Sequence, residues 1–89
     1  MPSRELAIIN KLGLHARAAA RFVTTASEHP CEIHVTRGER RVNGKSIMGV
    51  MMLAAGQGSQ IVVEAEGEGA EAALAALEQL VGSRFGEAE

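Results

Sequence analysis

The sequence predicts an α+β fold, an open-faced βαββαβα sandwich whose four-stranded antiparallel sheet carries its helices on one face. Two observations predict it. Short segments alternate apolar and polar residues with a period of two, and longer segments between them repeat apolar residues with a period near 3.6. Because the clearest strands have one apolar face each, we expect helices to cover one side of the sheet and leave the other side to solvent.

The first half of the chain predicts a strand, a helix and a second strand. Residues 4–10 contain alternating and β-branched residues before a loop that includes Gly13. From Ala16 to Ser27 the apolar residues recur at helical spacing, and Pro30 ends this amphipathic helix. Residues 31–37 then alternate, which is typical of a half-buried strand.

The middle of the chain predicts a hairpin, a short helix and a further strand. Residues 37–40 form the turn into a third strand at 40–43. Ser46 is expected to be the N-cap of a helix from 47 to about 53, because its hydroxyl can accept a hydrogen bond from a backbone N–H one turn later. Residues 59–66 alternate again and predict the fourth strand.

The last helix is expected to begin at Ala70, after a Gly-Glu-Gly break, and Gly82 or Gly86 can end it. The short acidic tail, residues 86–89, is expected to fray. We therefore interpret residues 1–89 as a single domain with its core in about 3–85. The helix that is expected to begin at Ala70 has an apolar stripe that comprises Ala70, Ala73, Leu74, Leu77, Leu80 and Val81.

Composition excludes several function classes. The formal net charge is -2 and the only aromatic residues are Phe22 and Phe85, so the chain lacks both the basic field and the stacking rings of a nucleic-acid binder. A nucleic-acid-binding sandwich therefore ranks last among the hypotheses. Cys31 is the only cysteine, which excludes an intrachain disulfide and a multi-thiolate zinc site. We expect no metal and no cofactor.

The sequence predicts neither a secretory signal nor a membrane-spanning helix. The amino end has no apolar segment typical of a secretory signal. The longest apolar stretch, residues 47–55, is far shorter than the roughly 20 residues that a transmembrane helix needs. We expect a cytoplasmic monomer that does not insert into membranes.

A first candidate site lies in the segment Gly13-Leu14-His15-Ala16-Arg17. With His15 at the N-cap, the first backbone N–H groups of the helix and the Arg17 guanidinium could stabilise an anion beside the ring. A neutral imidazole offers a nitrogen lone pair as a nucleophile, so this arrangement suits phosphoryl transfer. The alternative is that His15 is only a capping or surface residue. His29 and His34 receive no role.

Two further features lie in the predicted short helix. Its residues are apolar almost all round, so some of its methionines should be exposed and could form a surface that meets several partners; alternatively they fill gaps in the core. Ser46 is first of all a cap. A phosphate on its hydroxyl would place charge beside that surface and could block docking without unfolding the protein.

These residues together resemble the HPr family, the histidine-containing phosphocarriers of the bacterial phosphoenolpyruvate-dependent phosphotransferase system. The resemblance covers about residues 3–85, and two motifs carry it: Leu12-Gly13-Leu14-His15-Ala16-Arg17-Ala18-Ala19 and Asn43-Gly44-Lys45-Ser46-Ile47-Met48-Gly49-Val50-Met51-Met52. One departure is Ala18, where many members have Pro. Ala keeps a backbone N–H in the first turn at the cost of some rigidity.

The resemblance implies a phosphocarrier and not an enzyme. His15 would accept a phosphoryl group on Nδ1 from phospho-enzyme I and pass it to EIIA-type domains in sugar uptake or its regulation, and Arg17 would stabilise the phosphate. Ser46 matches the site that HPr kinase modifies in many members. The residues that match the family's docking surface are Ala20, Arg21, Thr24, Ile47, Met48, Met51 and Met52.

Two alternatives stay open beside the sugar-uptake carrier. A related nitrogen-regulatory phosphocarrier shares the same chemistry. A regulatory interaction module gated by phosphorylation of Ser46 would use the methionine surface and need His15 only as a cap.

Overall fold

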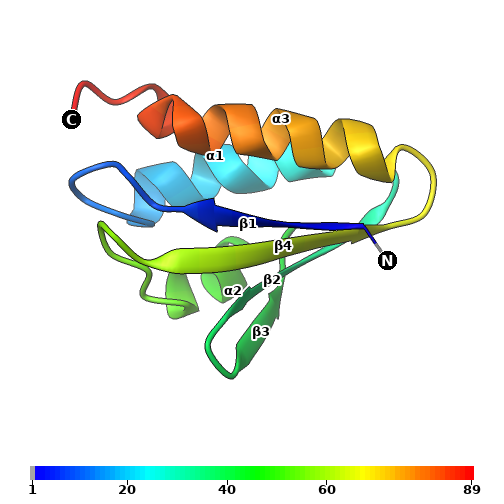
Figure 1. Ribbon diagram of the computed structural model, residues 1–89, viewed down its shortest axis with the longest axis horizontal. Coiled ribbons are helices and arrows are strands. Elements are labelled where there is room, and N and C mark those ends of the chain that lie inside the picture. The colour runs from blue at the N-terminus through cyan, green and yellow to red at the C-terminus, as the bar shows by residue number, and fades with distance from the viewer. Residues whose placement is uncertain (1) are drawn as a thin grey trace.

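The computed structural model describes residues 2–89 and confirms the predicted α+β sandwich (Figure 1). The four strands form one antiparallel sheet in the order β1-β4-β2-β3. The elements are β1 (Ser3–Ala7), α1 (Ala16–Ser27), β2 (Glu32–Arg37), β3 (Arg40–Asn43), α2 (Ile47–Met52), β4 (Gln60–Glu66), α3 (Ala70–Gly82) and a single 3-10 turn, η1 (Arg84–Gly86).

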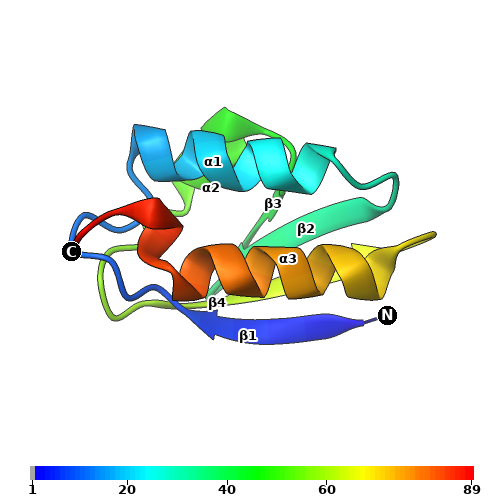
Figure 2. The same ribbon diagram turned by 90° about the horizontal axis from the view of Figure 1, so that it is seen from above.

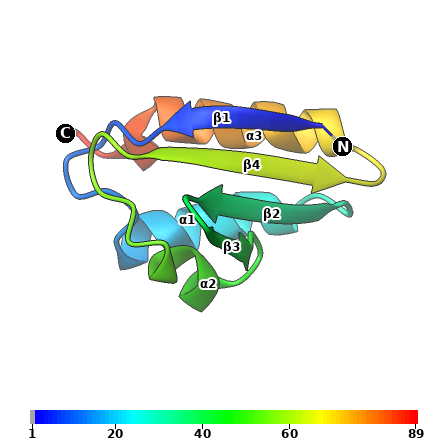
Figure 3. The ribbon, with the colours of Figure 1, turned by 60° about the horizontal axis from the view of Figure 1, so that its bottom comes forward.

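The helices lie on one side of the sheet, as predicted. Helices α1 and α3 run next to each other over the sheet, and α2 lies at the edge beside β3 (Figure 2). Seen from the opposite side, the sheet has no helix in front of β1, β4 and β2 (Figure 3). The two candidate sites predicted from the sequence, at the amino ends of α1 and α2, therefore lie on the helical side of the molecule.

Strand alternation places the core between sheet and helices. Val35 of β2 pairs with Val63 of β4 and with Val42 of β3, and Leu6 of β1 pairs with Ile61 of β4. Their alternate neighbours are more exposed, which is the pattern expected of a sheet with one buried face. The largest fully buried side chains are Phe22, Phe85, Ile8, Ile33, Ile61, Leu74 and Leu77.

Most predicted boundaries agree with the structure to within one residue, but the first strand is shorter than expected. The strand ends at Ala7 and not at residue 10. Ile8 still exchanges hydrogen bonds with the loop before β4, donating to Ser59 O (2.8 Å) and accepting from the Gly58 N–H (2.7 Å). Beyond Ile8 the chain leaves the sheet, and Asn10 turns its side chain into the interior.

The buried side of α1 also differs from the helical periodicity, which predicts an apolar arc of Ala16, Ala19, Ala20, Phe22, Val23 and Ala26. Ala16 is exposed, whereas Ala18 is fully buried together with Ala19, Phe22 and Ala26. In α3 the predicted stripe is buried except for Leu80, which is only partly covered. None of the helices in residues 2–89 is both long and apolar enough to cross a membrane.

Candidate functional site

A tight turn before α1 fixes the position of His15. Gly13 has a φ of +66°, and a Cβ added there would lie 2.4 Å from Ala55 O and 2.7 Å from Gly56 Cα. Only glycine fits both the left-handed backbone and this close approach. The next residue, Leu14, donates its backbone N–H to Ala55 O at 2.9 Å. The loop after α2 thus holds the segment that presents His15.

His15 is the N-cap residue of α1, as predicted, with extended backbone dihedrals. Its side chain makes no capping hydrogen bond, so the ring itself does not cap the helix. The first hydrogen bond of α1 joins the Ala19 N–H to His15 O at 2.8 Å, which leaves the N–H groups of Ala16, Arg17 and Ala18 unused by the helix. These donors and the helix dipole favour an anion beside the ring.

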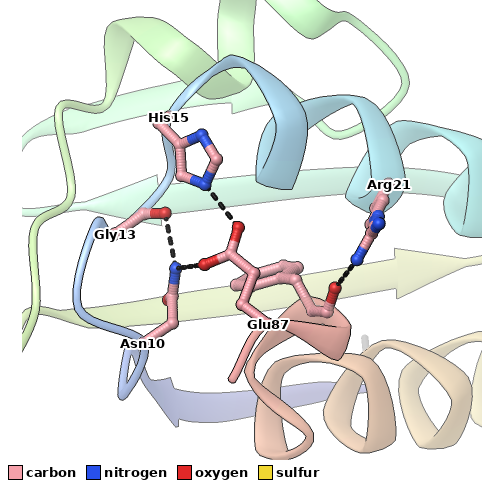
Figure 4. Close-up of polar contacts among 6 residues, drawn as sticks. Asn10, Gly13, His15, Arg21 and Glu87 are labelled. Carbon is pink, nitrogen blue, oxygen red and sulfur yellow. Dashed lines mark hydrogen bonds and ion pairs between the residues drawn. The ribbon is translucent and has the colours of Figure 1, made fainter. Parts of the chain in front are cut away.

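The ring of His15 is accessible at the surface and contacts the C-terminal tail. Its side chain is 29% exposed, and its Nε2 atom lies 2.5 Å from Glu87 Oε2. The other carboxylate oxygen, Oε1, accepts a hydrogen bond from Asn10 Nδ2 at 3.0 Å, and the same Asn10 amide donates to Gly13 O at 2.9 Å (Figure 4). The expectation that residues 86–89 fray is therefore wrong.

The contacts of Glu87 lower the pKa of its carboxyl group below the ordinary value of 4.5. The hydrogen bond from Asn10 is the largest cause and the bond with His15 the next, while the charges of His15 and Arg17 act in the same direction and burial opposes them. The side chain of Glu87 is only 14% exposed. The site thus holds a carboxylate that stays ionised and faces one nitrogen of the ring.

The tail reaches this position because two contacts anchor it. Phe85 is fully buried in the core, and Arg21 Nη1 donates a hydrogen bond to its backbone carbonyl oxygen. A Cβ on Gly86 would lie 2.9 Å from the same Nη1, so the absence of a side chain leaves room for the guanidinium. Glu87 was not predicted from the sequence as a residue of this site. The signal that could have revealed it is Phe85, an aromatic residue just before the tail.

Arg17 lies beside the ring with its charge available. Its side chain is exposed and makes no hydrogen bond or ion pair within residues 2–89. An open cleft of about 890 Å³ is lined by His15, Arg17, Arg21 and Glu87, among others. Since Arg21 is bonded to Phe85, Arg17 is the arginine of this cleft that remains available to an incoming anion.

The second predicted feature, at α2, has the expected local structure. Ser46 caps the helix through a hydrogen bond that its Oγ accepts from the Gly49 N–H at 3.1 Å. Val50 alone is fully buried, whereas Met48 is 72% exposed. The prediction that some methionines are exposed is confirmed. The exposed apolar residues of α2 are Ile47, Met48, Met51 and Met52.

The predicted docking residues of α1 have different environments. Helices α1 and α2 contact each other, which brings the two motifs to the same side of the fold. Ala20 is partly buried, and Thr24 is exposed with its hydroxyl donating to Ala20 O at 2.9 Å. Arg21 is exposed but engaged by the tail.

The remaining histidines, His29 and His34, are both partly buried. The backbone oxygen of His29 accepts a hydrogen bond from Lys45 Nζ at 2.6 Å, and His34 lies on the partly covered face of β2. No group of three or more His, Cys, Asp or Glu side chains within residues 2–89 could hold a metal ion.

The sequence of the chain is similar to those of known proteins. A family model described as the PTS HPr component phosphorylation site matches residues 2–83. The chain is similar to phosphocarrier protein HPr of Pseudomonas aeruginosa, with 56% identity over 90 residues and 100% of both chains covered. It is also similar to phosphocarrier protein NPr of Shewanella violacea, with 44% identity over 96% of this chain and 93% of the relative.

The fold of the chain is also similar to that of a solved structure. The crystal structure of HPr-C-His from Thermoanaerobacter tengcongensis matches with a TM-score of 0.96 and 46% sequence identity, and the match covers 100% of both chains.

Proposed function

Since the chain belongs to the HPr family, the phosphocarriers of the phosphotransferase system, we propose that His15 receives the phosphoryl group on its Nδ1 atom. Proteins of this family carry a phosphoryl group between components of that system and are not enzymes, and this chain is such a phosphocarrier. The proposal concerns which residues carry out the transfer and with which partners.

The proposal rests on the exposure of the His15 ring and on the partners of its two nitrogens. It is 29% exposed at the amino end of α1, its Nε2 is occupied by Glu87, and Nδ1 has no hydrogen-bond partner within residues 2–89. A nitrogen lone pair on Nδ1 can therefore attack phosphorus, and a macromolecular donor can reach it. The N–H groups of Ala16, Arg17 and Ala18 supply donors for the phosphoryl oxygens.

Arg17 is proposed to stabilise the bound phosphoryl group. Its exposed guanidinium lines the same cleft as His15 and has no competing partner within the described residues. A single available arginine holds an anion without enclosing it. This suits a carrier, which must release its cargo to the next partner, since excessive stabilisation of the phosphorylated state would slow the onward transfer.

The proposed partners are enzyme I as phosphoryl donor and EIIA-type domains as acceptors. We propose that they dock on the surface formed by Ala20, Arg21 and Thr24 of α1 and by Ile47, Met48, Met51 and Met52 of α2. Support comes from the exposed apolar residues of α2, because exposed apolar patches on a small protein are typical of interaction sites and methionines adapt to several partners.

The experiment is phosphorylation with phosphoenolpyruvate and enzyme I. We expect an acid-labile adduct on the wild type whose phosphorus NMR signal identifies an Nδ1-phosphohistidine. The variant His15→Ala should not be labelled, whereas His29→Ala and His34→Ala serve as matched controls that should be labelled normally. Labelling that survives His15→Ala contradicts the proposal.

Ser46 supports a second, regulatory proposal. Ser46 lies at the amino end of α2, next to the exposed Ile47 and Met48, and the residue is partly exposed. We propose that a kinase of the HPr kinase class modifies Ser46 and that the added charge weakens docking. Ser46→Asp should reduce partner binding. If the protein acts only as an interaction module, without phosphotransfer, His15→Ala should bind partners as the wild type does.

The similarity to an NPr protein keeps a nitrogen-regulatory branch as the alternative to sugar uptake. The two branches share the chemistry at His15 and differ in the acceptor. Incubating the phosphorylated protein with EIIA domains from both branches and comparing the transfer rates separates them.

A further inference from the structure

We infer that Glu87 is a positioning residue for phosphoryl transfer: its carboxylate holds the proton of the His15 ring on Nε2 and so keeps the lone pair on Nδ1. The inference rests on the proposed role of His15 as the phosphoryl acceptor. The geometric basis is the 2.5 Å contact between His15 Nε2 and Glu87 Oε2, in which an ionised carboxylate can only accept a hydrogen bond.

A neutral imidazole carries one proton, which sits on either Nδ1 or Nε2. Because the carboxylate faces Nε2, the tautomer protonated there gains a charge-assisted hydrogen bond, and the other tautomer would set a lone pair against a negative oxygen. In Figure 4 the second nitrogen of the ring points away from Glu87. Glu87 thus selects the tautomer whose unprotonated nitrogen is available to a phosphoryl donor.

Glu87 also faces the charge that develops during transfer. As the N–P bond forms from the Nδ1 lone pair, the bond between phosphorus and the donor breaks, and the donor keeps that electron pair. The proton stays on Nε2, so the ring becomes positively charged. A fixed carboxylate beside Nε2 stabilises this charge, as the aspartate of a serine protease triad does for its histidine. Transfer to the acceptor reverses these changes.

The surroundings of Glu87 show that its carboxylate is held in place. Asn10 is fully buried and donates from one amide nitrogen to both Gly13 O and Glu87 Oε1, while its own Oδ1 has no partner within residues 2–89. Turning the amide over would lose both of these bonds, so the orientation of Asn10 is set by its two acceptors.

The backbone before Glu87 is anchored as well. Phe85 is buried, its carbonyl oxygen accepts from Arg21, and the Glu87 N–H donates to Arg84 O at 2.9 Å. Side chain and backbone contacts together place the carboxylate at the ring. A carboxylate on a free tail would have to be ordered at each transfer, and the cost of that ordering would reduce its effect.

The test uses the full-length protein and the variant Glu87→Gln, which keeps size and hydrogen-bonding capacity but removes the charge. Glu68→Gln is the matched control, since it removes one negative charge from the exposed loop before α3, at the opposite end of that helix from the site (Figure 1). Nitrogen-15 NMR of the His15 ring reports the tautomer in the unphosphorylated protein, and the rate of labelling by enzyme I reports transfer.

We expect Glu87→Gln to raise the fraction of the Nδ1-protonated tautomer and to slow labelling by about tenfold, because a charged acceptor makes a markedly stronger hydrogen bond than a neutral one. Glu87→Asp should restore part of the rate, and Glu68→Gln should match the wild type. A wild-type tautomer ratio in Glu87→Gln, or a changed ratio with an unchanged rate, overturns the inference. Labelling that survives His15→Ala would instead contradict the proposed function itself.

Discussion

Arg21 in α1 donates a hydrogen bond from its guanidinium to the backbone carbonyl oxygen of Phe85, and this bond joins the helix whose N-cap is His15 to the segment that contains Glu87. Arg21 matches the docking surface in the sequence, yet in the structure it also holds the tail against the site. One side chain thus links two parts of the chain that are 64 residues apart.

Removing this bond is expected to loosen the tail. Arg21→Ala should lower the free energy of unfolding by about 1 kcal/mol, the typical net contribution of one hydrogen bond. It should also speed hydrogen exchange of the Gly86 and Glu87 amides, which donate to Ser83 O and Arg84 O. Arg84→Ala is the control, because Arg84 makes no side-chain hydrogen bond within the described residues. Unchanged exchange at both amides in Arg21→Ala would contradict the role assigned to this bond.

Replacing the glycine in the turn before His15 should cost more stability than replacing the glycine of the hairpin turn. Gly13→Ala should cost about 2–4 kcal/mol, since it combines a left-handed backbone with overlap against Ala55 O. Gly38 has a similar φ of +60° but no atom within 4 Å of an added Cβ, so Gly38→Ala should cost only about 1–2 kcal/mol. Urea denaturation measures both. Equal losses would show that the contact with Ala55 does not constrain the turn.

The capping role of Ser46 predicts that its variants separate stability from docking. Ser46→Ala should lower the free energy of unfolding by about 1 kcal/mol, because the Gly49 N–H loses its acceptor. Ser46→Asp retains an acceptor and should be close to the wild type in stability while docking enzyme I more weakly. Thermal unfolding and binding titration give the two readouts. Weak docking by Ser46→Ala with normal docking by Ser46→Asp would be the contrary result.

Acid is expected to release the tail from His15. The pKa of Glu87 is lower in the folded protein than its ordinary value of 4.5, chiefly because Asn10 and His15 hydrogen-bond its carboxylate. A lowered folded-state pKa means that this contribution to stability is complete above about pH 4.5 and is lost as the pH falls through the folded-state pKa. The wild type should therefore lose its stability advantage over Glu87→Gln in that range. Denaturation curves at a series of pH values check this, and a pH-independent difference would refute it.

The exposed face of α2 predicts that its outermost methionine matters for partners and not for folding. Met48 is 72% exposed, so Met48→Asp should change the free energy of unfolding by less than about 0.5 kcal/mol. It should weaken docking of enzyme I by about fivefold or more, which corresponds to about 1 kcal/mol. Val50→Asp gives the contrast, since it places a charge in the core and should unfold the protein. Normal docking by Met48→Asp would exclude Met48 from the interface.

The sequence predicted those elements whose signals are local. Helix α1 and strand β3 have the predicted bounds, because helical periodicity and a hairpin turn are both visible over a few neighbouring residues. Ser46 could be identified as a cap for the same reason. His15 and Arg17 could be selected as candidates because an anion site at a helix start needs only the helix and its first residues.

The tail could not be predicted in this way. Residues 86–89 have no periodicity, and their position depends on contacts with Asn10, His15 and Arg21 that are distant in sequence. The early end of β1 and the burial of Asn10 follow from the same long-range packing. Composition could describe the tail as acidic, but only the folded arrangement shows that Glu87 contacts His15 and that Glu89 pairs with Lys11.

The hydrogen bond between the Leu14 N–H and Ala55 O has a consequence for how the chain can vary in length. An added or deleted residue between Met52 and Gln60 would shift the carbonyl that supports the histidine, even though that loop is remote from it in sequence. The open turn at Gly38 has no such neighbour and should accept extra residues with little effect. We therefore expect natural insertions to accumulate at the hairpin and to be scarce in the loop between α2 and β4, which supports the His15 segment.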